Sequence, residues 1–218
     1  AFHNQAEAID SLVHAGADVN ATNDYQVTPL SLACEYGNTD AVIALLAAKA
    51  DPSLSRLGKE TPLMLAALAN DVRAVKHLID HGAQVDAREV RQQTALMWAS
   101  AAGNVEVVDE LIQAGADLNA RLPRSDFSAI MFAARNGRSD VVMRLLDAGL
   151  DVNAIMQPKQ TSGRNPRKGM SALLLAVESG HLELALKLVG RGADPNDQRS
   201  GFAPLHAITW VRRTELGD

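Results

Sequence analysis

The chain is poor in cysteine and in aromatic residues. Cys34 is the only cysteine among 218 residues, so no disulfide framework can form within the chain. Its position among small residues favours a buried spacer over a nucleophile. Aromatic residues make up 4% of the chain and hydrophobic residues 47%, so alanine and leucine must supply most of the core. No apolar run approaches the roughly 20 residues that a membrane-spanning helix needs, and we expect no membrane insertion.

The signatures of common catalytic sites are also missing. A phosphate-binding loop needs Gly-x-x-x-x-Gly-Lys, but five residues separate Gly163 from Gly169, and Met170 stands where lysine should be. His77 and His81 share one face of a predicted helix, yet nothing nearby in sequence supplies a third metal ligand. No Gly-x-Ser-x-Gly nucleophile motif occurs. We therefore predict no enzymatic activity, no cofactor, no metal site and no small-molecule substrate.

What the chain does have is a repeat. Thr28-Pro29-Leu30 returns thirty-three residues later as Thr61-Pro62-Leu63, and weaker copies follow at 94, 128, 171 and 203. The interval from each complete repeat's opening residue to its turn residue is always 21 residues, whereas the interval to the next opening varies. A half of constant length and a half of variable length indicate a solenoid of stacked units, since one unit cannot bury its own apolar face.

The constant half predicts two short helices. Thr or Ser can cap the first helix, and proline suits its first position. The second helix carries apolar residues at helical spacing, as in Val108, Leu111 and Ile112. Glycine then ends that helix in the left-handed conformation, except that Lys49 stands in this place in one repeat. The predicted fold class is all-α, a solenoid of stacked helix-turn-helix units with short β-hairpin finger loops.

The Thr-Pro-Leu openings, together with Gly-Ala-Asp-Val-Asn at residues 16–20, resemble the ankyrin repeat over essentially the whole chain. The family's histidine after Thr-Pro-Leu survives only as His206, and softer apolar packing takes over elsewhere. The segment Thr-Ala-Leu-Met-Trp-Ala at residues 94–99 is similar to the corresponding segment of bacterial ankyrin proteins. The resemblance implies one array that opens with a partial repeat at residues 1–27 and closes with the start of a truncated or capping repeat at 203–218. Between them lie five full repeats, at 28–60, 61–93, 94–127, 128–170 and 171–202. The fourth full repeat, 128–170, contains an inserted loop at about 157–168.

The template predicts incomplete repeats at both ends of the chain. Either the chain is a segment of a longer protein, or its terminal repeats are atypical caps. The compartment stays open at this point: cytoplasmic is the default, and a periplasmic or secreted location would apply if a signal peptide precedes the segment.

Charge is distributed unevenly along the chain. The formal net charge is −5, made up of −9 for residues 1–120, +5 for 121–168 and −1 for 169–218. The basic region includes the inserted loop, which is rich in Pro, Gly, Ser and Asn and carries no acidic residue. Insertions in repeat proteins often lie on the binding face. The basic region predicts docking of an acidic partner, and ordinary solvated surface is the alternative. Because the pI is about 5.7 and aromatic stacking residues are scarce, nucleic-acid or other polyanion binding by 121–168 is the weaker hypothesis.

The resemblance implies a non-catalytic scaffold that binds a protein partner through finger loops and the concave face of the first helices. A recognition or spacer segment of a larger multidomain enzyme is the other alternative. The apolar residues just before each repeat's opening, such as Phe127, either contact the partner or pack on the next repeat. The candidate partner-binding residues are Tyr25, Val27, Tyr36, Leu57, Leu68, Arg91, Gln93, Arg124, Phe127, Arg135, Arg164, Arg167, Lys168, Met170, Phe202 and Trp210.

Overall fold

The computed structural model of the chain describes residues 3–159 and 168–210. These residues form helices and no named strand. The helices are α1 (His3–His14), α2 (Pro29–Glu35), α3 (Thr39–Ala47), α4 (Pro62–Leu68), α5 (Val72–Asp80), α6 (Ala95–Ala102), α7 (Val105–Gln113), α8 (Ala129–Arg135), α9 (Ser139–Asp147), α10 (Ala172–Glu178), α11 (Leu182–Gly190) and α12 (Pro204–Trp210).

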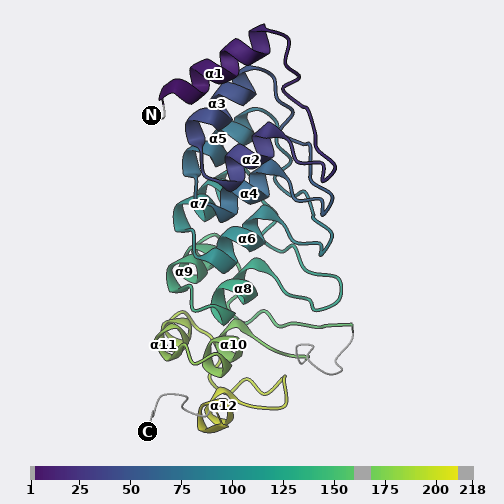
Figure 1. The fold of residues 1–218 in the computed structure, drawn as a ribbon. Helices are drawn as coiled ribbons and strands as arrows, with labels where there is room; N and C mark the ends of the chain where they lie inside the picture. Colours follow the sequence, from purple (N-terminus) through teal and green to yellow (C-terminus); the bar gives the residue numbers. More distant parts are fainter. Residues whose placement is uncertain (1–2, 160–167, 211–218) are drawn as a thin grey trace, which may run out of the picture. The chain divides into compact units, whose positions relative to one another are not determined.

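The chain divides into two compact units. Unit 1 comprises Ala1–Ala99 with Asn104–Asp117, and unit 2 comprises Ser100–Gly103 with Leu118–Asp218. In unit 1, α2 packs on α3 and on α4, α3 packs on α5, and α5 packs on α7 (Figure 1). In unit 2, α10 packs on α8, α11 and α12. Each unit is therefore a stack of helix pairs, as the repeat predicts.

The first helices α2, α4 and α10 each begin at a capping side chain. The Thr28 side-chain oxygen accepts a hydrogen bond from Ser31 N at 3.0 Å, and Ser31 Oγ accepts one from Thr28 N at 3.0 Å. Pro29 follows at the first helical position, where no amide hydrogen is needed. Thr61 and Ser171 cap α4 and α10 through a single hydrogen bond each. The Thr and Ser positions read from the sequence thus set where these helices start.

Apolar residues at helical spacing form the core of each unit. In the second helices, Val75 and Leu78 of α5 and Val108 and Leu111 of α7 are fully buried. Alanines of the first helices, such as Ala66 and Ala67, are also fully buried and leave room for the neighbouring helices to approach closely. The second-helix pattern in the sequence therefore identifies the buried face correctly.

The turn after each second helix has the left-handed backbone that the sequence predicts. Gly82 has a φ of 89° and Gly115 a φ of 83°, and Lys49 takes the same geometry with a φ of 67°. Side chains with a Cβ disfavour this region by about 1–2 kcal/mol, so Lys49 stores a small strain that its glycine counterparts avoid.

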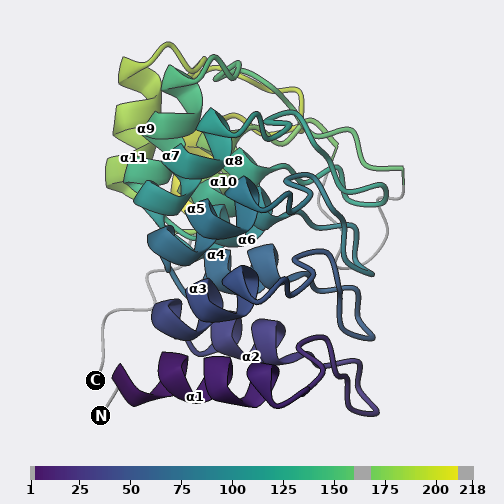
Figure 2. The same cartoon turned by 90° about the horizontal axis from the view of Figure 1, so that it is seen from above.

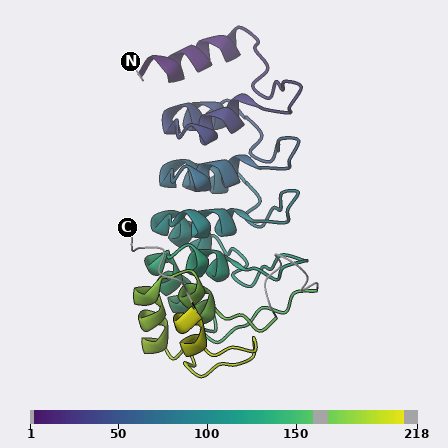
Figure 3. The ribbon, with the colours of Figure 1, turned by 60° about the horizontal axis from the view of Figure 1, so that its bottom comes forward.

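The finger loops leave the helices on one side of each unit (Figures 1, 2 and 3). In unit 1 they are closed by turns, for example Lys59 N donating to Arg56 O at 2.8 Å. The expected β-hairpin character is slight, because Ile155 and Ser171 make the one isolated antiparallel bridge in the described part of the chain. Each finger is thus a hydrogen-bonded turn rather than a pair of strands.

Candidate protein-binding surface

The fingertips of unit 1 expose several predicted partner-binding residues. Tyr25 and Leu57 are largely exposed, and so is Arg91. Val27 is half-buried and donates its amide hydrogen to Asn23 Oδ1 at 3.0 Å. Gln93 is also half-buried, and its side-chain oxygen accepts a hydrogen bond from Trp98 Nε1 at 3.1 Å. Tyr25, Leu57 and Arg91 are therefore open to solvent, whereas Val27 and Gln93 form hydrogen bonds within the chain.

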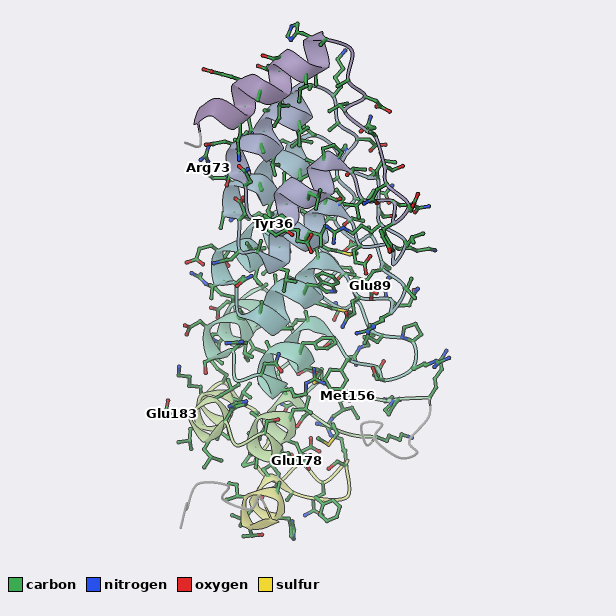
Figure 4. The ribbon with its side chains drawn as sticks, viewed as in Figure 1. Tyr36, Arg73, Glu89, Met156, Glu178 and Glu183 are labelled. Atoms are coloured by element: carbon green, nitrogen blue, oxygen red, sulfur yellow. The ribbon has the colours of Figure 1, made fainter. Side chains whose placement is uncertain are left out.

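The C-terminal ends of the first helices in unit 1 add a second exposed group. Tyr36 directly follows α2 and is 79% exposed, and Leu68 at the end of α4 is about half exposed (Figure 4). Beside them Glu35 accepts a hydrogen bond from Arg56 at 2.6 Å. That hydrogen bond lowers the pKa of Glu35 below its usual value. The Glu35 carboxylate is therefore bound to Arg56, while the uncharged side chains of Tyr36 and Leu68 remain exposed.

In unit 2 an arginine lies over two phenylalanine rings. The guanidinium carbon of Arg135 is 5.0 Å from the ring centroid of Phe127 and 5.3 Å from that of Phe132. The two ring centroids are 5.1 Å apart. Arg135 is exposed while both rings are buried, so the rings orient a cation that remains open to solvent. Phe127 is therefore buried within unit 2, where its ring contacts the Arg135 guanidinium.

The base of the inserted loop buries a second residue that we expected at the surface. Met156 N donates to Met170 O at 2.9 Å, and Gly169 N donates to Met156 O at 2.8 Å. Both methionine side chains are buried, and Met156 is labelled in Figure 4. Met170 thus anchors the loop, because its side chain packs into unit 2 instead of facing solvent. Lys168, two residues earlier, is exposed.

The remaining candidates are less well placed or lie outside the description. Arg124 is exposed, and its carbonyl oxygen accepts a hydrogen bond from Lys159 N at 3.3 Å, so two cationic residues are neighbours at these fingertips. Phe202 is half-buried. Trp210 ends α12, but its side chain is outside the described residues. Arg164 and Arg167 also lie outside the described residues.

Most finger carboxylates are used internally. Glu89 is buried and accepts hydrogen bonds from Arg91 N at 2.8 Å and Gln93 N at 2.9 Å (Figure 4). Asp126 accepts from Arg121 at 2.8 Å and from Gln157 N at 2.7 Å. Asp197 accepts from the guanidinium of Arg199, which lowers the pKa of Asp197. Asp24 at the first fingertip is exposed, and so are Asp51, Asp86 and Asp151 nearer the bases of their fingers.

Cations therefore dominate what the fingertips show to solvent. Lys59 and Arg91 in unit 1, and Arg124, Lys159 and Lys168 in unit 2, are all exposed. Lys159 belongs to the basic region 121–168 already expected to bind an acidic partner, whereas Lys59 and Val90 were not among the predicted contact residues. The sequence could have indicated them, since Lys59 lies in the same finger turn as the predicted contact residue Leu57, and Val90 directly precedes the predicted contact residue Arg91.

The described residues offer little for catalysis. Within residues 3–159 and 168–210, no group of three or more His, Cys, Asp or Glu could hold a metal ion. Burial, aided by the nearby Asp71 charge, raises the pKa of the Cys34 thiol to about 12, so this sulfur remains protonated and unreactive. A pocket of about 460 Å³ in unit 2 is lined almost wholly by apolar side chains of α10, α11 and α12. In the described part of the chain, no helix is long and apolar enough to cross a membrane.

The helix-pair stacks with projecting turns define a repeat protein of the helical solenoid class. The family description "Ankyrin repeats (3 copies)" matches residues 1–89, 48–122, 84–156 and 123–199, and the chain belongs to the ankyrin repeat family. Ankyrin repeats generally mediate protein–protein interactions, and domains built from them are typically non-catalytic binding modules.

One solved structure supports the same fold. The crystal structure of the human ASB11 ankyrin repeat domain is similar to this chain with a TM-score of 0.71 and 23% sequence identity. The similarity covers 84% of this chain and 77% of that one. No curated protein sequence shows significant similarity to the chain.

Proposed function

We propose that the chain is a non-catalytic interaction module that holds an acidic segment of a partner protein against its fingertips and the adjoining ends of its first helices. The observation that carries this proposal is the division of finger charges: carboxylates such as Glu89, Asp126 and Asp197 are bound internally, while the fingertip cations are exposed. A chain with a formal net charge of −5 thus offers a locally cationic surface. Such a surface steers an acidic partner and disfavours basic ones.

Unit 2 carries the basic contacts that we propose, as a surface of that unit alone. Arg124 and Lys159 are neighbours in the backbone, and Lys168 lies at the base of the same inserted loop. Arg164 and Arg167 belong to the proposed site on the strength of their charge. Arg135 differs from these residues because Phe127 and Phe132 hold its guanidinium in place, which reduces the entropy lost on binding.

Unit 1 carries the apolar contacts that we propose, as a separate surface of its own. Tyr25, Leu57 and Val90 project from the fingers, and Tyr36 and Leu68 project from the helix ends. Tyrosine and arginine are frequent binding hot spots because they combine large contact area with polar groups. We therefore assign partner contact to these residues and leave the buried Phe127 and Met170 outside the contact set.

A charge-reversal experiment tests the proposal. The variant Arg124→Glu, Lys159→Glu, Lys168→Glu is compared with the parent chain for binding of a fluorescein-labelled peptide of glutamate and leucine, measured by anisotropy at several salt concentrations. We expect at least about tenfold weaker binding and a shallower salt dependence, since the cations that attract the peptide are gone. The melting temperature should hardly change, because exposed substitutions away from packed groups alter stability by less than about 0.5 kcal/mol.

A matched control makes the same change in net charge elsewhere. Arg73, Lys76 and Lys187 are exposed residues of second helices, and Arg73→Glu, Lys76→Glu, Lys187→Glu should leave peptide binding close to that of the parent. An equal loss in both variants would show that only net charge matters and would refute the site. Tight binding of a single-stranded oligonucleotide, lost in the fingertip variant, would instead support the polyanion hypothesis.

A further inference from the structure

One exposed arginine of unit 2 is held in place without using its hydrogen-bond donors. Four other arginines of this unit donate to oxygen acceptors of the protein, and they are Arg121, Arg138, Arg191 and Arg199. Within residues 3–159 and 168–210, the guanidinium of Arg135 makes no hydrogen bond and no ion pair. A guanidinium carries five N–H donors in a planar fork, so those of Arg135 remain available to a partner.

Two buried aromatic rings hold this guanidinium in place of an oxygen acceptor. Its carbon atom lies 5.0 Å from the ring centroid of Phe127 and 5.3 Å from that of Phe132, and the two rings are tilted by 53° to each other. The electron-rich faces of the rings attract the positive charge. This attraction fixes the position of the charge, yet it gives the N–H groups no oxygen to bond.

The main chain at Arg135 is fixed as well. His181, which directly precedes α11, donates a hydrogen bond from Nε2 to Arg135 O at 3.0 Å. The imidazole can come this close because Gly137 has no side chain: a Cβ at Gly137 would lie 2.6 Å from His181 Nδ1. Gly137 also has a φ of 68°, which favours glycine. Arg135 is therefore constrained at its main chain and at its side chain.

Arg135 lies at the C-terminal end of α8, among the first-helix ends that the proposed function assigns to partner contact. The corresponding position of the other described repeats holds an acidic or an uncharged residue, in chain order Glu35, Leu68, Ala101 and Glu178. A positive charge at this position therefore marks one place in the array and is not part of a continuous basic stripe.

A carboxylate is the chemical group that fits these constraints. Its two oxygens match two parallel N–H groups of a guanidinium, and such charge-assisted pairs are among the strong hydrogen bonds of proteins. Because the Arg135 side chain is already held by the rings, little of its conformational entropy remains to be lost on binding. The rings also exclude water from part of the guanidinium, which strengthens its attraction for an anion.

We infer that Arg135 is the specificity-determining contact of unit 2 and binds one aspartate or glutamate side chain of the partner protein through two parallel hydrogen bonds. Phe127, Phe132 and His181 are positioning residues that act through Arg135. This inference rests on the proposed function, in which exposed cations attract an acidic segment by charge. It adds the residue that fixes where one carboxylate of that segment lies.

Substitution by lysine separates forked recognition from charge. The full chain, Arg135→Lys and Arg135→Gln are titrated with the fluorescein-labelled peptide of glutamate and leucine, by anisotropy at several salt concentrations. Lysine keeps the charge but lacks the planar fork and its stacking on the rings. We expect Arg135→Lys to weaken binding about fivefold or more with an unchanged salt dependence. Arg135→Gln should weaken binding further and make the salt dependence shallower, because the charge is also lost.

Two controls accompany these variants. Arg191→Lys changes an exposed arginine that pairs with Asp147 away from the proposed contacts, and it should bind the peptide like the parent. A second peptide, in which glutamine replaces every glutamate, should bind weakly and should not distinguish the parent from Arg135→Lys, because it offers no carboxylate.

Removing one ring tests the positioning of Arg135. Phe132→Leu leaves Arg135 and its charge in place but takes away one of the two ring faces. Leu175 is the equivalent residue of α10 and has the same 7% exposure, so Leu175→Val is a matched change in the core. Both variants should lower the melting temperature by similar small amounts, whereas only Phe132→Leu should weaken peptide binding, by about threefold or more.

The outcomes separate this inference from the proposed function. Parent-like affinity of Arg135→Lys, or equal affinities of Phe132→Leu and Leu175→Val, would overturn the inference. An effect of Arg135→Lys on oligonucleotide binding but not on peptide binding would also overturn it. If the Arg135 variants bind normally while Arg124→Glu, Lys159→Glu, Lys168→Glu does not, the proposed function stands on charge alone. If none of these variants changes peptide binding, the proposed function itself fails.

Discussion

Replacing Leu111 by alanine should destabilise unit 1 more than a typical single substitution. Leu111 lies on α7 and is 0% exposed, and α7 packs on α5, where Leu78 occupies the equivalent position and is also fully buried. The substitution leaves the helix intact, because alanine is the best helix former, so the change acts on packing alone.

The expected magnitude follows from the burial of this side chain. Leucine to alanine removes three carbon groups, and at about 0.8 kcal/mol per buried methylene the lost transfer free energy is about 2.4 kcal/mol. Neighbouring residues relax only partly into the space, and the residual cavity brings the expected loss to roughly 2–5 kcal/mol. The fully buried position favours a value above the lower end of this range.

The loss in the free energy of unfolding is measured by urea titration followed by circular dichroism. The slope of that free energy against urea concentration is compared between the variant and the parent. Leu186→Ala is a suitable control, since Leu186 lies on the second helix α11 and is largely exposed; it should change stability by less than about 0.5 kcal/mol. A loss below about 1 kcal/mol for Leu111→Ala would mean that the helix face assigned to the core is wrong.

Two further substitutions probe caps and titrating groups. Thr28→Ala should cost about 1 kcal/mol because it removes the hydroxyl that accepts a hydrogen bond from Ser31 N, whereas Ser128→Ala should cost less because the Ser128 side chain makes no capping bond. Similar losses in urea unfolding would contradict the capping role. Arg199 lowers the pKa of Asp197 in the folded chain, so unfolding takes up a proton and this contribution to stability, present above about pH 4, is lost as the pH falls through the folded-state pKa. Thermal melts between pH 7 and pH 2 should therefore show a smaller acid-induced drop for Asp197→Asn than for the parent, and equal drops would refute the assignment.

Helix positions and core residues could be predicted largely from the sequence. The openings at Thr28, Thr61 and Ser171 predicted capped helix starts, and the spacing of Val108 and Leu111 predicted a buried face, because both features depend on residues within one or two helical turns. The left-handed turn at Lys49 followed from its alignment with glycines in the other repeats. Such local signals recur in each repeat and reinforce one another.

The candidate surface was predicted less completely. Phe127 and Met170 occupy the same place in the repeat as the half-buried Val27 and Phe202, and alignment alone could not show that the former two are buried. The burial of Met170 depends on Met156, fourteen residues earlier across the inserted loop. Val90 and Lys59 lie beside the aligned finger positions, and only the folded turns show that their side chains are exposed.

The amino-acid order alone determined the period, the helical class and the apolar face of each helix, since these depend on contacts and hydrogen bonds between residues close together in the chain. Only the tertiary structure decided which charges remain available to a partner, because carboxylates such as Glu89 and Asp126 pair with whichever amide or guanidinium groups the folded chain brings near. It also decided that Tyr25, Leu57 and Val90 follow one another from finger to finger, since that order rests on hydrogen bonds between segments more than thirty residues apart.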